Sequence, residues 1–112
     1  MAALPVWDRE SLLSRLGSDE SLLEVLLVTF IQQWQVLFSE LHQYLQAGDA
    51  QRLSRVAHTM KGAAANLEAA RIRELCLIME KLASAGRLEE AGRLIPQLEE
   101  QYRDFLGACG KK

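Results

Sequence analysis

Three residues able to do chemistry together lie at helical spacing between Ala57 and Asn66. His58, Lys61 and Gly62 occupy positions i, i+3 and i+4. Residues three and four apart are neighbours on a helix surface. A helix here would therefore place the imidazole beside an ammonium group and above a residue without a side chain. We expect this arrangement to suit a phosphoryl group, because lysine offsets negative charge and glycine leaves room.

The apolar pattern of the same segment predicts that His58 faces solvent. At 3.6 residues per turn, His58 lies about 140° and Gly62 about 180° from the centre of the apolar face, whereas Lys61 lies about 80° from it. A helical glycine costs about 0.5–1 kcal/mol relative to alanine. Close approach of another protein would explain the glycine. From the spacing alone, an accidental surface histidine beside an accidental glycine is an equally open interpretation. The same outer face carries Ser54, Arg55 and Ala65.

Composition places the chain among ordinary globular domains. It has 112 residues, 49% of them hydrophobic and 25% charged, with a formal net charge of -2. This balance gives no basic surface for nucleic acid. The longest apolar stretches are shorter than the roughly 20 residues of a membrane span, and the start of the chain lacks the pattern of a secretory signal. Cys76 and Cys109 are far apart and form no CxxC pair, so we expect two free thiols in a cytoplasmic protein.

Helical periodicity and capping residues predict an all-α domain that spans residues 1–112. We expect a short N-terminal helix and then an antiparallel, up-down four-helix bundle, because the connections are short. Pro96 should kink or break the last segment, and residues 109–112 should form a frayed tail. The expected helices cover residues 8–17, 19–46, 49–67, 69–85 and 88–108.

The sequence around His58, Lys61 and Gly62 resembles the histidine-containing phosphotransfer (HPt) domains of multistep phosphorelays. The segment from Ala57 to Leu67 is similar to the family signature: a histidine, then lysine and glycine three and four positions later, then small residues. Trp7-Asp8, Phe30 and the turn Ala47-Gly48-Asp49 resemble other family positions, so the similarity extends over nearly the whole chain.

The resemblance implies that His58 accepts a phosphoryl group from an aspartyl phosphate of one receiver domain and passes it to an aspartate of another. Lys61 would stabilise phosphoryl charge, and Gly62 would give steric access. The partners would be receivers of a hybrid histidine kinase and of a downstream regulator. Magnesium is expected on the receiver, with no metal or cofactor bound by this chain, which we expect to be a monomer. The predicted partner-binding residues are Arg55, Ala65, Val28 and Ser54.

One position departs from the family pattern. Glu68 stands where the family commonly has glycine, at the turn after the histidine helix. Such a glycine serves as a helix C-cap with positive φ, a conformation that glutamate adopts at a cost. Either Asn66 supplies the left-handed residue, or the helix continues slightly further before it turns.

Two other functional classes remain open at this point. A helical module could regulate a receiver or a kinase by docking alone, without transfer. An enzyme could use His58 as a general base or in a phosphatase reaction, but no second catalytic group accompanies it. The chain has no nucleotide-binding glycine loop and no kinase motif, so we expect no ATP-dependent kinase activity of its own.

Overall fold

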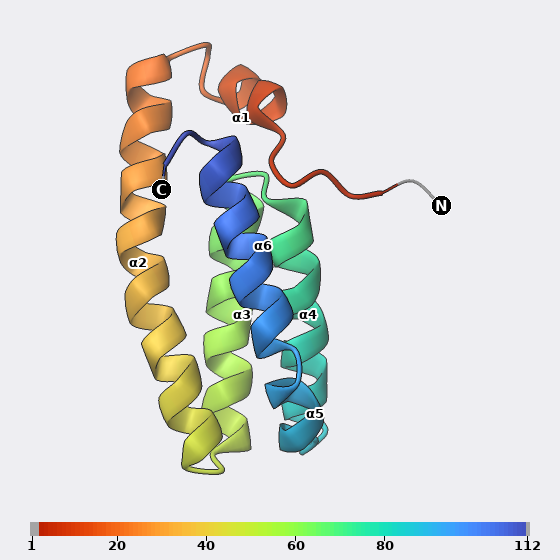
Figure 1. Cartoon of the computed structure of the whole chain (residues 1–112). Helices are drawn as coiled ribbons and strands as arrows, with labels where there is room; N and C mark the ends of the chain where they lie inside the picture. Colours follow the sequence, from red (N-terminus) through yellow and green to blue (C-terminus); the bar gives the residue numbers. More distant parts are fainter. Residues whose placement is uncertain (1–2, 112) are drawn as a thin grey trace.

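The computed structural model describes residues 3–111 and contains only helices among them. The long helices lie side by side and alternate in direction, and a short N-terminal helix crosses one end of this bundle (Figure 1). The predicted all-α, up-down bundle with an additional N-terminal helix is confirmed. In chain order the helices are α1 (Arg9–Arg15), α2 (Glu20–Gln46), α3 (Ala50–Asn66), α4 (Ala70–Ser84), α5 (Leu88–Gly92) and α6 (Ile95–Ala108).

Aspartate caps define where the first three helices begin. The carboxylates of Asp8, Asp19 and Asp49 each accept a hydrogen bond from the backbone N–H three residues later, at 3.0–3.1 Å. Each bond satisfies a helix N–H that has no partner within the helix. Asp19 is the N-cap of α2, at the start of the range 19–46 that the sequence predicts for the long helix.

A single apolar core joins the four long helices. Phe30 and Trp34 of α2 contact Tyr102 and Phe105 of α6, with ring centroids 5.0–6.4 Å apart. By length and composition α2 could also cross a membrane. One face of it is nevertheless buried in this core, as in a helix of a globular bundle, so the apolar character of α2 does not indicate a membrane span. The buried residues of α2 are Leu23, Leu27, Phe30, Trp34 and Leu41.

The C-terminal segment breaks before Pro96, as the sequence predicts. α5 ends at Gly92, and Pro96 lies in the first turn of α6, where its missing N–H costs no helical hydrogen bond. The structure places a helix C-cap within residues 109–112, where the sequence predicts a frayed tail. The backbone N–H of Lys111 donates to the carbonyl of Leu106 at 2.8 Å, which closes α6 in the way typical of a helix C-cap. Lys112 lies outside the described residues.

The turn between α3 and α4 is formed by Glu68 itself. Its φ is +59°, and Asn66 is the last residue of α3, so both expected alternatives are wrong. The turn retains the hydrogen bond of a C-cap, from Ala69 N–H to the Ala64 carbonyl at 3.0 Å. Glutamate here carries the strain that a glycine would avoid.

The N-terminal segment is fastened to this same turn. Asp8 N–H donates to the Glu68 carbonyl at 3.1 Å. The Arg15 guanidinium donates to the Asn66 carbonyl at 2.7 Å and lies 3.0 Å from the Glu68 carboxylate. These contacts explain how a non-glycine residue is held in the left-handed conformation at this position.

We predict that Glu68→Gly is more stable than Glu68→Ala by about 1 kcal/mol, because both lose the Arg15 ion pair but only alanine keeps the strained Cβ. Urea denaturation of the two variants measures this difference. Equal free energies of unfolding would show that the turn carries no strain.

Candidate functional site

His58 lies on the outer face of α3, as the helical wheel predicts. Its side chain is 65% exposed. The opposite face of α3 is packed into the core through Leu53, Val56, Ala57, Met60 and Ala64. Several turns of buried side chains thus fix the helix, so the imidazole is held on a rigid element while it remains open to solvent.

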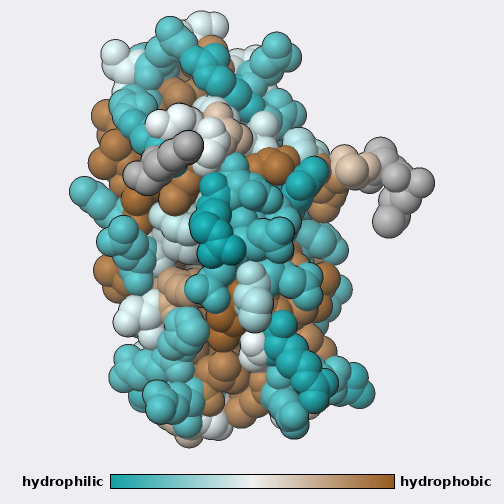
Figure 2. Space-filling view, viewed as in Figure 1, coloured by the Kyte–Doolittle hydropathy of each residue, from teal (hydrophilic) through white to brown (hydrophobic). Residues whose placement is uncertain are grey.

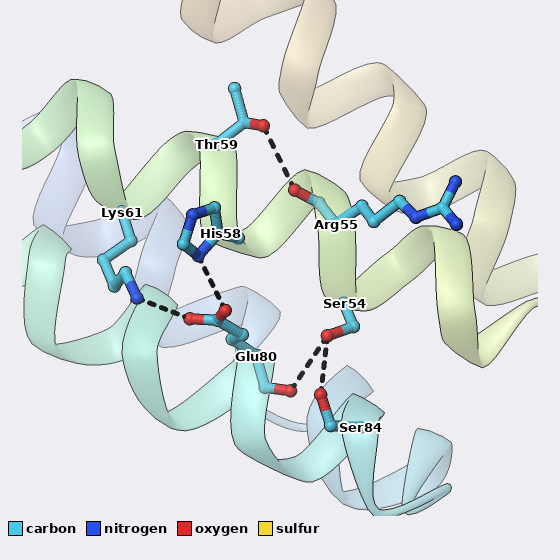
Figure 3. Close-up of polar contacts among 7 residues, drawn as sticks. All are labelled: Ser54, Arg55, His58, Thr59, Lys61, Glu80 and Ser84. Carbon is cyan, nitrogen blue, oxygen red and sulfur yellow. Dashed lines mark hydrogen bonds and ion pairs between the residues drawn. The ribbon is translucent and has the colours of Figure 1, made fainter.

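A carboxylate from the next helix contacts both the histidine and the lysine. Glu80 of α4 places Oε2 2.8 Å from His58 Nδ1 and Oε1 2.7 Å from Lys61 Nζ. Figure 3 shows the carboxylate between the two side chains, with the other ring nitrogen of His58 on the far side of the ring. Two residues of α3 are therefore bridged by one residue of α4.

The protonation of Glu80 decides which nitrogen of His58 carries the proton. The hydrogen bond from Lys61 lowers the pKa of the Glu80 carboxyl below its usual 4.5, and that from His58 lowers it further, against the opposing effect of burial. At neutral pH the carboxylate is ionised and can only accept hydrogen bonds. Nδ1 must then be the donor, which leaves Nε2 of the neutral imidazole with a free lone pair.

The Lys61 side chain is partly buried and is held by an ion pair. Its side chain is 23% exposed, and its ammonium is bound to Glu80. The ion pair holds Lys61 between α3 and α4, beside His58 (Figure 3). The lysine is thus adjacent to the imidazole, as predicted, but already has an anionic partner.

Gly62 is exposed, and a Cβ built on it would meet no atom within 4 Å. Internal packing therefore does not require a glycine at this position. The space above it belongs to the surface beside His58, and a role in steric access stays a prediction.

Comparison with known proteins places this site within a known fold and family. The model of the Hpt domain family matches residues 25–108, which include the whole of α3 and α4. The chain belongs to the Hpt domain family. A solved structure with a similar fold is the histidine-containing phosphotransfer protein B (HptB) from Pseudomonas aeruginosa PAO1. The two are 35% identical with a TM-score of 0.84, over 92% of this chain and 90% of that one. A comparison with curated proteins found no match.

Hpt domains are phosphotransfer modules of two-component signalling that interact with receiver domains of response regulators. Membership therefore makes this chain a phosphotransfer intermediate, and it confirms the resemblance drawn from the sequence.

The predicted partner-binding residues of this Hpt domain occupy different environments. Arg55 and Ala65 are exposed on α3, and Val28 is 41% exposed on α2. Ser54 is turned toward α4 instead: its hydroxyl lies 2.7 Å from that of Ser84 and 3.4 Å from the Glu80 carbonyl. Ser54 therefore links the two helices, which a prediction of partner contact did not anticipate.

Glu80 is the site residue that the sequence analysis did not predict, because it lies on a different helix from His58. The sequence does hold a signal for Glu80, namely that it and His58 lie at similar distances on either side of the turn between the two helices. His58 precedes Glu68 by ten residues and Glu80 follows it by twelve, so an antiparallel pair of helices that turns at Glu68 brings them to the same level.

Metal-binding geometry is a separate question. Within residues 3–111, no three or more His, Cys, Asp or Glu side chains are grouped so as to hold a metal ion.

Proposed function

We propose that Nε2 of His58 accepts a phosphoryl group from the aspartyl phosphate of one receiver domain and passes it to an aspartate of another. The observation that carries this proposal is the hydrogen bond between Nδ1 and Glu80. It directs the free lone pair of an exposed imidazole away from the protein, toward an incoming partner.

The fixed tautomer allows transfer without movement of a proton. Nε2 attacks phosphorus, the bond from phosphorus to the aspartyl oxygen breaks, and the carboxylate leaves. The ring keeps its proton on Nδ1 and becomes a phosphoimidazolium paired with Glu80. The reverse steps, with a second aspartate, restore the neutral ring. No general base is needed, so catalysis consists of positioning and charge stabilisation.

Charge stabilisation is shared between the two proteins. Lys61 lies beside His58 and supplies a cation next to the phosphoryl oxygens, while magnesium is expected on the receiver. We infer that the chain binds no cofactor and does not phosphorylate itself from ATP.

The docking surface combines basic and apolar residues of α2 and α3. α3 has no acidic residue but carries Arg52, Arg55 and Lys61, which suits the acidic pocket of a receiver. Arg52 lies over the Tyr44 ring, 5.8 Å from its centroid. Because α2 and α3 are antiparallel, Val36, eight residues before Tyr44, lies level with Met60, eight residues after Arg52. Val36 is therefore close to the helical turn that carries His58.

Val36 is 62% exposed, and Leu22, Val25 and Val28 on the same helix are exposed as well. Figure 2 shows apolar atoms along the α2 edge of the molecule. Exposed apolar residues beside a functional site are typical of protein interfaces. We therefore add Val36 to the predicted contact Val28.

The direct test uses a purified phosphorylated receiver as the donor. We expect label on a phosphohistidine that is labile to acid and stable to base, and none on His58→Gln, which has no nucleophilic ring nitrogen. His42→Gln, which changes the other exposed histidine, is the matched control and should accept label normally. If the His58→Gln and His42→Gln variants both bind the receiver but neither takes label, the module regulates by docking alone. Label on His58→Gln would place the phosphoryl group elsewhere.

A second test separates access from folding at Gly62. Glutamine has a better helix propensity than glycine. The free energy of unfolding of Gly62→Gln should therefore equal that of the parent or exceed it by up to about 1 kcal/mol. Its side chain fills the space beside His58, so transfer should fall about tenfold or more, equivalent to about 1.4 kcal/mol of lost docking free energy. Gly107 in α6 also has open space around it, and Gly107→Gln is the control. Unchanged transfer by Gly62→Gln would remove Gly62 from the site.

A further inference from the structure

We infer that Glu80 sets the lifetime of the phosphorylated protein, by keeping Nδ1 of the phosphorylated ring protonated and so making His58 a better leaving group. This inference rests on the proposed phosphorylation of His58 Nε2. It concerns the stored phosphoryl group rather than its arrival from a receiver.

The geometry supports this role because Glu80 is fixed from three directions. One carboxylate oxygen accepts from His58 and the other from Lys61. The Glu80 backbone carbonyl accepts a hydrogen bond from Ser54, whose hydroxyl also contacts Ser84 (Figure 3). A phosphoryl group on Nε2 would sit on the far side of the ring, so it need not displace the carboxylate from Nδ1.

Leaving-group chemistry then follows from the position of one proton. From a phosphoimidazolium, the bond between Nε2 and phosphorus breaks to release neutral imidazole, while the phosphoryl group passes to an aspartate or to water. From the deprotonated ring, the same cleavage would release an imidazolate anion, which is a far poorer leaving group. An imidazolium with an ordinary pKa of about 6.5 would be largely deprotonated at pH 8, whereas an anion at hydrogen-bond distance favours the protonated form.

Other charged groups near the ring come from the same two helices. Lys61 and Arg55 lie on α3, and Lys81 lies on α4 beside Lys61 and Glu80. All three are cations, and cations disfavour a protonated ring. Within the part of the chain that the structure describes, Glu80 is the one carboxylate that pairs with His58, so it alone can hold the proton.

The test measures hydrolysis without any receiver. Proteins in a His42→Gln background are phosphorylated with potassium phosphoramidate, freed of reagent, and followed by phosphorus NMR at pH 8 and pH 6. Glutamine still accepts from Nδ1 but carries no charge. We expect the phosphohistidine of Glu80→Gln to last about tenfold longer at pH 8, because the charged hydrogen-bond partner of Nδ1 is lost, and to approach the parent at pH 6. Glu74→Gln, which alters another carboxylate of α4, should match the parent.

Lys61 needs its own control, because Glu80→Gln also releases it. In a Lys61→Met background, the effect of Glu80→Gln should persist. Equal lifetimes of Glu80→Gln and the parent at pH 8 would overturn the inference, and so would an effect that disappears with Lys61→Met. A failure of transfer from receivers would instead contradict the proposed function, since this assay contains none.

Discussion

The site depends on one carboxylate that is shared between two side chains. Glu80 accepts from His58 and Lys61 at once, and both bonds require α3 and α4 to lie in one antiparallel register. A shift of α4 by one helical turn, about 5.4 Å, would break both contacts. The hairpin that ends in the strained turn at Glu68, and the Ser54–Ser84 contact further along, therefore belong to the apparatus that positions the histidine.

This arrangement suits a group that must be both exposed and chemically defined. In an imidazole, the hydrogen bond made by one ring nitrogen decides which of the two nitrogens carries the proton. Here α3 is anchored by its buried face, and Glu80 fixes the ring from the side, so the outer nitrogen is open to solvent and to a partner. Gly62 leaves space beside it at a modest cost in helix stability. Rigidity comes from the core and accessibility from the surface of the same helix.

Most of the fold was predictable because its signals are local. The caps at Asp8, Asp19 and Asp49, the apolar faces and the break at Pro96 each depend on residues within a few turns. The turn at Glu68 was not, because its left-handed conformation is maintained by Arg15 and Asp8, which lie more than fifty residues earlier. Within the site, His58, Lys61 and Gly62 were visible as spacing on one helix. Glu80 was not, since its role arises only when a second helix packs at a particular register.

The most direct test of this account is the tautomer of His58 in the unphosphorylated protein. Nitrogen-15 NMR correlations through the ring protons distinguish a protonated Nδ1 from a protonated Nε2, and the exposed His42 serves as an internal reference. At pH 8 we expect His58 to carry its proton on Nδ1, and Glu80→Ala to lose this preference. A proton on Nε2 in the native protein would contradict it, because the nitrogen that faces the partner would then have no lone pair to offer.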